Sequence, residues 1–331
     1  MAVMEINQEK IPTVRLFDGQ LAPCIGMGTF GSDHASPVKV KEAVYGAIRY
    51  GYRFFDCASV YGNEAEIGEI FTKAVSEGIV RRGELFITSK VWNDRHGKGD
   101  VLISLAQTLK DLQLDYVDCY FVHWPFPNYH APGCDADSRN PGAKPFKAGQ
   151  FMEVWQQMEK IADMGLSRYI GMSNMTIPKL EAVLPLCRIK PAFIEMEFHP
   201  SFQQKELLDY CFKHGIKPIG FCPLGSPNRP VRDKTPDDVV DTELTEVVNV
   251  AAARGIHPAL VCLKWAVQKG VIPIPFSTNE KNYQANLRCV TEGLLKKSEM
   301  ELLEKAERNC RLVKGQVFLW PEAKGWQDLW D

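Results

Sequence analysis

The sequence has no long apolar run and no marked excess of one charge. No stretch approaches the roughly 18 apolar residues of a membrane-spanning helix, and the start, Met1 to Val14, lacks the apolar segment of a secretory signal. Lysine and arginine number 39 against 41 acidic residues, interspersed, so the formal net charge of −2 gives no field for nucleic acid or a membrane surface. We therefore expect a cytoplasmic protein that binds neither.

The ten cysteines include no pair with CxxC spacing, a pattern typical of zinc and redox sites. Most of them lie in apolar runs, so we expect buried, reduced thiols and no metal in the functional site, with disulfides or a zinc site as the alternative. The cysteines in apolar runs are Cys24, Cys57, Cys119, Cys211, Cys222 and Cys262.

The chain is long enough, at 331 residues with 45% hydrophobic content, to bury one large α/β domain or two ordinary ones. Eight short apolar runs alternate with segments in which apolar residues recur at three and four positions, as in 38–48 and 152–161. Apolar strands alternating with amphipathic helices predict a parallel sheet covered by helices. Eight such units predict one closed (β/α)8 barrel, a TIM barrel, over residues 1–331. The eight runs are 23–28, 54–58, 85–90, 117–123, 168–173, 193–198, 217–223 and 272–276.

A short β-hairpin is expected ahead of the barrel. Apolar and polar residues alternate over residues 12–20 around the turn signal Asp18-Gly19. The competing architecture is a doubly wound sheet, whose GxGxxG phosphate loop follows the first strand. Residues 26–31 match that spacing, but no helix opens directly after them, which favours the barrel.

Three successive strand-like runs end in ionisable residues, Asp56, Lys90 and His123. In a parallel barrel the carboxyl ends of all strands lie on one face. Because an unpaired charge in an apolar strand is costly, Asp56 needs a partner, and Lys90 is the best candidate. Tyr61 follows Asp56 in a short loop. We therefore expect all four side chains to converge on a single site.

Three stretches lie outside the repeat, and two of them are expected to form long loops on this face. Residues 125–149 are too many for an ordinary connection, and residues 225–242 carry several basic side chains. Long loops on a catalytic face build substrate contacts. In the tail 313–331 we expect some aromatic residues to pack on the barrel and at least one to cover the site. These aromatic residues are Phe318, Trp320, Trp326 and Trp330.

The chain resembles the aldo-keto reductases over nearly its whole length. Any one of the matching motifs is a weak signal, but their order at successive strand ends is specific. The resemblance implies a (β/α)8 barrel that holds a nicotinamide cofactor, NAD(H) or NADP(H), and transfers hydride between it and a carbonyl or alcohol. The motifs are Gly28-Thr29-Phe30, Phe55-Asp56-Cys57-Ala58 with Tyr61-Gly62-Asn63-Glu64, Ser89-Lys90-Val91-Trp92, Val122-His123-Trp124-Pro125, Gly171-Met172-Ser173-Asn174, Glu197-Phe198-His199-Pro200 and Pro223-Leu224-Gly225.

The chemistry of carbonyl reduction suits the four strand-end residues. A carbonyl that accepts hydride also needs a proton, so Tyr61 is the expected general acid, and the base in the reverse direction. A phenol has a pKa of about 10, and the ammonium of Lys90 is expected to lower it. Asp56 is expected to hold Lys90 charged and in place, and His123 to orient the substrate oxygen.

The resemblance also implies a cofactor site, with departures from the family pattern. Ser173 and Asn174 match residues that bind the nicotinamide carboxamide, but the third partner, usually Gln, is Glu195. A carboxylate accepts from the amide nitrogen but donates nothing unless it is protonated. Phe221 replaces the usual stacking Tyr. The expected cofactor contacts are Gly28, Thr29, Ser173, Asn174, Glu195, Phe221, Pro223, Leu224, Ser226, Phe276, Ser277, Thr278, Asn279, Asn282 and Asn286.

Both charges that grip a 2′-phosphate in NADPH-preferring relatives are missing after the eighth strand. Phe276 stands in place of a Lys and Asn282 in place of an Arg, and Ala285 replaces a Glu. Charge-assisted contacts are the strong ones, so we expect NADH to be used at least as well as NADPH. Lys281 or Arg288 are the candidates for a substitute phosphate contact.

The substrate pocket is expected to be aromatic. Phe30, Trp92 and Trp124 follow three of the strands, and with His123 they would exclude water from the hydride path. The polar loop 125–149, which contains Asn128, Tyr129, His130 and acidic residues, favours a sugar or polyol. The alternative is a sugar-phosphate reductase or polyol-phosphate dehydrogenase, for which the basic candidates are Arg229, Arg232 and Lys144.

Two other classes of function stay open. In a (β/α)8 isomerase or aldolase, Lys90 would be a Schiff-base nucleophile. In a cofactor-sensing subunit the barrel would bind the cofactor without turnover, and the intact set of four residues argues against it. The family is most often monomeric, so we expect a monomer or weak homo-oligomer acting on a small carbonyl or polyol.

Overall fold

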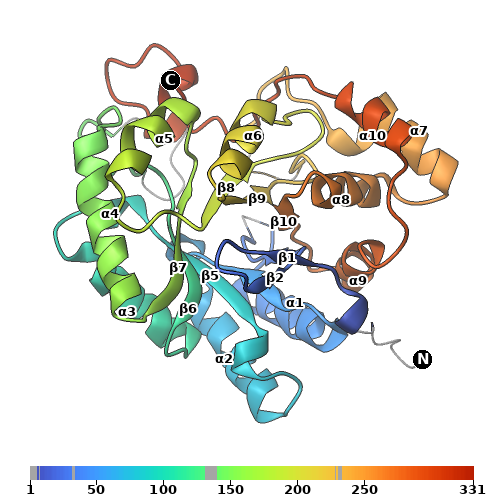
Figure 1. The fold of residues 1–331 in the computed structure, drawn as a ribbon, viewed down its shortest axis with the longest axis horizontal. Coiled ribbons are helices and arrows are strands. Elements are labelled where there is room, and N and C mark those ends of the chain that lie inside the picture. Colours follow the sequence, from blue (N-terminus) through green and yellow to red (C-terminus); the bar gives the residue numbers. More distant parts are fainter. Residues whose placement is uncertain (1–5, 7, 32–33, 131–139, 228, 230–232) are drawn as a thin grey trace.

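Eight parallel strands form the centre of the molecule (Figure 1). The computed structural model describes all residues except 1–5, 7, 32–33, 131–139, 228 and 230–232. The strands lie side by side in sequence order, from β3 to β10. They correspond to the eight predicted runs and are β3 (Met27–Gly28), β4 (Phe54–Asp56), β5 (Phe86–Val91), β6 (Val117–Val122), β7 (Ser167–Ser173), β8 (Phe193–Glu197), β9 (Lys217–Phe221) and β10 (Ile272–Pro273).

Backbone hydrogen bonds close the sheet between its first and last strands. The amide of Gly26 donates to the carbonyl of Pro273 at 3.0 Å, and the amide of Gly28 donates to that of Pro275 at 3.2 Å. The first glycines of the 26–31 segment therefore lie along the barrel wall, and the next helix begins only at Pro37. The predicted (β/α)8 barrel is confirmed, and the doubly wound alternative is wrong.

Helices surround the strands, as the alternating apolar pattern predicts (Figure 1). Within the described residues, α7 and α10 are additions to the simple alternation. No single described helix has the length and apolarity to cross a membrane; α7 and α8 reach them only as a pair bent by 99°. The helices are α1 (Pro37–Tyr50), α2 (Glu64–Ser76), α3 (Asp100–Leu112), α4 (Ala148–Asp163), α5 (Ile177–Val183), α6 (Lys205–Lys213), α7 (Thr245–Arg254), α8 (Pro258–Gln268), α9 (Glu280–Cys289) and α10 (Lys297–Glu304).

The N-terminal hairpin covers the amino ends of the barrel strands. β1 (Thr13–Arg15) pairs antiparallel with β2 (Leu21–Pro23), and Gly19 turns the chain with φ +85°. The predicted hairpin is confirmed, but its second strand lies beyond residue 20 and includes Pro23, which was assigned to the first barrel strand. Leu16 and Ala22 pack against the barrel interior.

Side chains fill the barrel interior near the amino ends of the strands, so the interior is a packed core and not a channel. The rings of Phe54 and Phe86 are 4.9 Å apart, and that of Phe193 is 5.6 Å from Phe86. Side chains two positions apart on a strand share a face. Asp56 and Glu195 therefore follow Phe54 and Phe193 into the interior, one layer nearer the carboxyl ends.

Nine cysteines lie in the described part of the chain, and each is a free thiol. Seven are buried, and Cys222 and Cys310 are half-buried. The prediction of reduced thiols is confirmed for these nine, whereas Cys134 lies outside the described residues.

Candidate active site

Asp56, Tyr61, Lys90 and His123 lie together at the carboxyl ends of β4, β5 and β6. Lys90 is fully buried, and its Nζ donates to Asp56 Oδ2 at 2.5 Å and to the Cys57 carbonyl at 3.1 Å. The hydroxyl of Tyr61, in the 3-10 turn η2 (Ser59–Tyr61), lies 3.3 Å from the same Nζ. The His123 ring centre is 6.0 Å from that of Tyr61. The structure thus brings the four predicted side chains into one cluster.

A second buried carboxyl group shares Lys90, which the sequence did not indicate. Glu195 Oε1, from β8, lies 3.4 Å from Lys90 Nζ. Burial works against the charge of Lys90, but the carboxylates of Asp56 and Glu195 outweigh it and raise the pKa of Lys90 well above its ordinary value. Lys90 is therefore held as an ammonium. An ammonium has no free electron pair, which argues against the Schiff-base alternative.

The predicted lowering of the Tyr61 pKa is wrong as a net effect. Burial raises the pKa of Tyr61 above its ordinary value, and the opposing effect of the Lys90 ammonium is smaller. The charges of Asp56 and Glu195 add to the rise. Tyr61 therefore keeps its proton until a strongly basic oxygen develops beside it, which suits a proton donor.

His123 is held neutral at the edge of the cluster. Burial first, and then the Lys90 ammonium, lower the pKa of His123 well below its ordinary value. Its ring centre is 4.9 Å from that of Trp92. Its Nδ1 is a buried atom with no hydrogen-bond partner in the described structure. A neutral imidazole carries one N–H, so His123 has a single donor to offer an oxygen.

Aromatic rings surround the cluster. Phe30 is 48% exposed, and its ring centre lies 5.0 Å from that of Tyr61. Trp92 is half-buried and packs against Phe318 of the tail at 5.8 Å. Trp124 is buried behind Phe318, at 4.6 Å, so it supports the wall from the back.

The aromatic residues of the tail pack against the aromatic rings around the site, as expected for some of them. Phe318 contacts Trp92 at the site, whereas Trp330 packs 5.6 Å from Trp124 and stacks on the guanidinium of Arg311. Trp320 is half-buried against the same cluster. Phe318 is thus the tail residue that reaches the aromatic wall.

Asn128 anchors the long loop and does not face a substrate. It is 2% exposed. Its Nδ2 donates to the carbonyls of Lys144 and Phe318 at 2.8 and 2.9 Å, and its Oδ1 accepts from the Lys144 amide at 2.8 Å. All hydrogen-bonding capacity of the amide group but one lone pair is therefore used internally. Asn128 therefore ties the loop to the tail, and the polarity it gives the loop serves this internal contact.

Two buried acceptor atoms lie without partners beside the cluster. Asn174 Oδ1 and Glu195 Oε2 make no hydrogen bond within the described residues. The backbones of the two residues adjoin, because Ser173 and Glu195 are paired in register and the Asn174 amide donates to the Glu195 carbonyl at 3.1 Å. The Asn174 Nδ2 donates to the His123 carbonyl at 2.9 Å, which fixes the amide orientation. Buried acceptors need donors, and the N–H groups of a carboxamide are donors of the kind that each atom lacks.

Two predicted cofactor contacts, Gly28 and Thr29 at the end of the first strand, contact the neighbouring strands of the barrel. Thr29 is buried, and its hydroxyl donates to the Asp56 carbonyl at 2.8 Å. A Cβ on Gly28 would lie 3.0 Å from the Ile274 carbonyl, so the first and last strands approach closely only because this residue is Gly. Both residues therefore hold Asp56 and the barrel seam in place.

A tight turn follows β9 at the barrel mouth. Phe221 is half-buried at the strand end, with its register partner Glu197 on β8. Cys222 and Ser226 have φ of +51° and +38°, a left-handed conformation that is uncommon for these residue types. The other predicted contacts of this turn are Pro223, which is buried, and Leu224, which is half-buried.

The segment after β10 leads into the amino end of α9. Asn279 caps this helix, with its Oδ1 accepting from the Lys281 amide at 3.0 Å. Arg288 lies in the last turn, 3.7 Å from Glu292, at the opposite end of the helix from Asn279. Lys281 is exposed in the first turn, where Glu280 adds a negative charge. The other predicted contacts are Phe276 and Ser277, half-buried, Thr278 and Asn282, exposed, and Asn286, buried.

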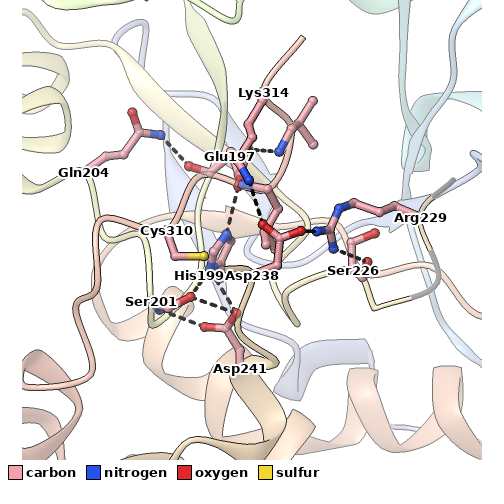
Figure 2. Close-up of polar contacts among 12 residues, drawn as sticks. Glu197, His199, Ser201, Gln204, Ser226, Arg229, Asp238, Asp241, Cys310 and Lys314 are labelled. Atoms are coloured by element: carbon pink, nitrogen blue, oxygen red, sulfur yellow. Dashed lines mark hydrogen bonds and ion pairs between the residues drawn. The ribbon is translucent and has the colours of Figure 1, made fainter. Parts of the chain in front are cut away.

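A buried histidine holds the end of β8 to the loop that follows β9 (Figure 2). His199 Nε2 lies 3.0 Å from Glu197 Oε1, and its Nδ1 lies 3.0 Å from Asp241 Oδ2. Burial opposes a charge on the ring, but the hydrogen bonds to both carboxylates raise the pKa of His199 to about 9. Glu197 also accepts from the amides of Leu312 and Val313, at 2.6 and 2.9 Å. The strand end, the loop and the start of the tail are therefore tied together.

Of the three basic residues predicted for a phosphate group, Arg229 is engaged elsewhere. Arg229 is buried and forms an ion pair with Asp238, which also accepts from Lys314 at 2.8 Å (Figure 2). Lys144 is exposed, and Arg232 lies outside the described residues. Within the described chain, no group of three or more His, Cys, Asp and Glu side chains is placed to hold a metal ion.

Known proteins match this chain over most of its length. The family model described as the aldo/keto reductase family matches residues 24–308. An aldo/keto reductase of Synechocystis sp. is 38% identical over 317 residues, which covers 96% of this chain and 95% of the relative. Aldo-keto reductase family 1 member A1 of Xenopus tropicalis is 38% identical over 300 residues, or 90% of this chain and 89% of that protein.

A solved structure agrees with these matches. A Bombyx mori aldo-keto reductase in complex with NADP superposes with a TM-score of 0.80 at 29% identity, covering 92% of this chain and 95% of that one. The barrel and its strand-end cluster therefore define an oxidoreductase. The chain belongs to the aldo/keto reductase family.

Proposed function

We propose that this enzyme reduces an aldehyde or ketone to the alcohol, or catalyses the reverse, with Tyr61 as the group that gives and takes the proton. The observation that carries the proposal is the Tyr61 hydroxyl 3.3 Å from Lys90 Nζ, which itself lies 2.5 Å from Asp56. A phenol beside a fixed ammonium is a donor whose conjugate base is stabilised in place.

When bound, a nicotinamide dinucleotide supplies or accepts the hydride. Asn174 and Glu195 would hold its carboxamide through their unpartnered oxygens. In reduction, Tyr61 passes its proton to the substrate oxygen as negative charge develops there, and Lys90 stabilises the phenolate left behind. His123 donates a hydrogen bond to the same oxygen. In oxidation the phenolate takes the proton back.

The proposal includes use of NAD(H) at least as readily as NADP(H). Phe276 and Asn282 carry no charge that would pair with a 2′-phosphate. The first turn of α9 contains Glu280, whose carboxylate would repel one. The exposed Lys281 is the opposing contribution, and an exposed ammonium binds weakly.

The substrate proposed is a small carbonyl compound of sugar-like type without a phosphate group. The aromatic wall of Phe30 and Trp92 provides flat faces, and Arg229 is occupied by Asp238. Sugar phosphates are the alternative. A panel of aldoses, sugar phosphates, uronates and simple aldehydes with both cofactors distinguishes the two.

The test of the proton donor is Tyr61→Phe. Removal of a general acid should lower kcat/KM for aldehyde reduction by about a hundredfold to ten-thousandfold, while cofactor affinity measured by fluorescence stays unchanged. The control is Tyr45→Phe, which removes the hydroxyl of a half-buried tyrosine in α1 that is bonded to Glu77. Turnover of Tyr61→Phe within about tenfold of the parent would remove Tyr61 from its role.

A further inference from the structure

The buried side chain of Glu195 has too few hydrogen-bond partners for an ionised carboxylate. It is 2% exposed, its Oε1 lies 3.4 Å from Lys90 Nζ, and its Oε2 has no hydrogen-bond partner among the described residues. Asp56, in contrast, uses both oxygens, with Oδ2 2.5 Å from Lys90 Nζ and Oδ1 accepting from the Thr88 hydroxyl at 2.6 Å. Asp56 is therefore the stronger partner of the ammonium.

Two carboxyl groups around one ammonium leave an excess negative charge in the barrel interior if both ionise. Buried like charges in one site oppose ionisation of the second group. Of the two, Glu195 has the weaker contacts, so it is the group that keeps a proton. The titratable groups around it are Asp56 on β4, Tyr61 in η2, Lys90 on β5 and Cys119 on β6, whereas its register partners Ser173 and Ile219 do not titrate.

We propose that Glu195 is a positioning residue that carries a proton in the working enzyme, and that loss of this proton suppresses carbonyl reduction. A neutral Glu195 leaves the Lys90 ammonium to Asp56 and Tyr61. An ionised Glu195 competes for that ammonium, and its charge disfavours the Tyr61 phenolate that proton donation produces. The inference rests on the proposed function, because Glu195 acts through Tyr61.

The acidity of Glu195 places this change in an accessible pH range. Burial first, and then the Asp56 charge, raise the pKa of Glu195 to about 8, against the attraction of Lys90. A neutral carboxylic acid presents one donor and one acceptor, as a Gln amide does. Glu195→Gln therefore imitates the protonated state at every pH and removes the titration.

Glu64 provides a matched control. It is also a buried carboxyl group, and burial raises its pKa to about 7. Its oxygens accept from the hydroxyls of Ser89 and Thr108, at 2.6 and 3.1 Å. Glu64→Gln removes a buried acid of similar kind that has no hydrogen bond to Lys90 or Asp56 among the described residues.

The first measurement locates the proton without cofactor or substrate. Infrared absorption of the protonated carboxyl group, followed through a pH titration, should show buried acids that ionise near pH 7 and near pH 8. Glu64→Gln should lack the first signal and Glu195→Gln the second. A signal near pH 8 that persists in Glu195→Gln overturns the proposal.

The second measurement is the pH profile of kcat/KM for aldehyde reduction. The parent and Glu64→Gln should lose up to about tenfold per pH unit above the Glu195 pKa, whereas Glu195→Gln should stay level. A decline in Glu195→Gln equal to that of the parent overturns the role. If no form reduces any carbonyl with either cofactor, the proposed function fails and the suppression with it, while the infrared titration still decides whether Glu195 bears the proton.

Discussion

Lys90 Nζ and Asp56 Oδ2 form a 2.5 Å ion pair from which solvent is excluded, since the side chains are 0% and 2% exposed. Removing one member of a buried pair leaves a charge without its partner, whereas removing both can be nearly neutral. Comparing the single and double variants therefore separates the effect of the pair on stability from its effect on Tyr61.

We expect Lys90→Met to lower the free energy of unfolding by about 3 to 5 kcal/mol and to abolish carbonyl reduction. The double variant Asp56→Asn/Lys90→Met should recover most of the stability, because both charges are gone, and none of the activity. Urea unfolding and aldehyde turnover measure the two effects. A double variant as unstable as Lys90→Met would contradict the electrostatic explanation.

The convergence of Asp56, Lys90 and His123 is predictable from sequence because it requires only the barrel. Each residue ends an apolar run, and parallel strands bring their carboxyl ends to one face whatever the packing of the side chains. The contact between Glu195 and Lys90 is different. β8 and β5 are separated in the sheet by β6 and β7, so their side chains meet only across the closed interior.

The sequence does not show how deeply a side chain is buried or which distant residue it bonds to. The Lys90 ammonium lowers the Tyr61 pKa as predicted, but the larger opposing effect depends on how completely water is excluded, which no local pattern reveals. Because Asn128 lies in a polar loop, the sequence suggests that it is exposed at the surface. Its partner, the Phe318 carbonyl, lies 190 positions along the chain and is brought near only by the folded tail.

His199 should make stability depend on pH in a defined direction. Its folded pKa of about 9 lies above the ordinary value of 6.5. The stabilisation is therefore fully present below about pH 6.5 and is lost as the pH rises through about 9. Since the ring is fully buried, the shift corresponds to about 3 kcal/mol.

The measurement compares the parent with His199→Gln by urea unfolding between about pH 6 and about pH 10. The difference in unfolding free energy should shrink as the pH rises through 9. The control is His214→Gln, which removes an exposed histidine bonded to the Tyr210 carbonyl. A difference between parent and His199→Gln that is constant with pH would show that the ring is not charged in the folded protein.

Asn128→Ala should loosen the long loop where it meets the tail. The substitution leaves the Lys144 amide and the carbonyls of Lys144 and Phe318 without their partner, which should cost about 1 to 3 kcal/mol of stability. Hydrogen exchange at the Lys144 amide should accelerate, and KM for the carbonyl substrate should rise because Phe318 supports the wall with Trp92. Asn140→Ala, in the same loop but half-buried, is the control. Unchanged exchange at Lys144 would show that Asn128 does not anchor the loop.

Cofactor choice should depend on the two uncharged positions around the start of α9. The parent should use NADH at least as well as NADPH, and an NADPH preference of about a hundredfold in kcat/KM would defeat this prediction. Phe276→Lys/Asn282→Arg should raise the NADPH to NADH ratio of kcat/KM by about tenfold or more, because it supplies charge-assisted contacts to a 2′-phosphate.

A matched control tests whether the position of the added charge matters. Gln284→Arg adds one positive charge two residues further along α9, about 200° around the helix from Asn282. If the ratio rises in Asn282→Arg alone, which adds the same single charge, and not in Gln284→Arg, the charge acts at a local phosphate site. Because exposed charges act over about a Debye length of 8 to 10 Å at ordinary salt, an equal rise in Gln284→Arg would instead indicate a diffuse field. The direction of the preference would then follow from the net charge around Glu280 and Lys281, and not from the loss of specific contacts.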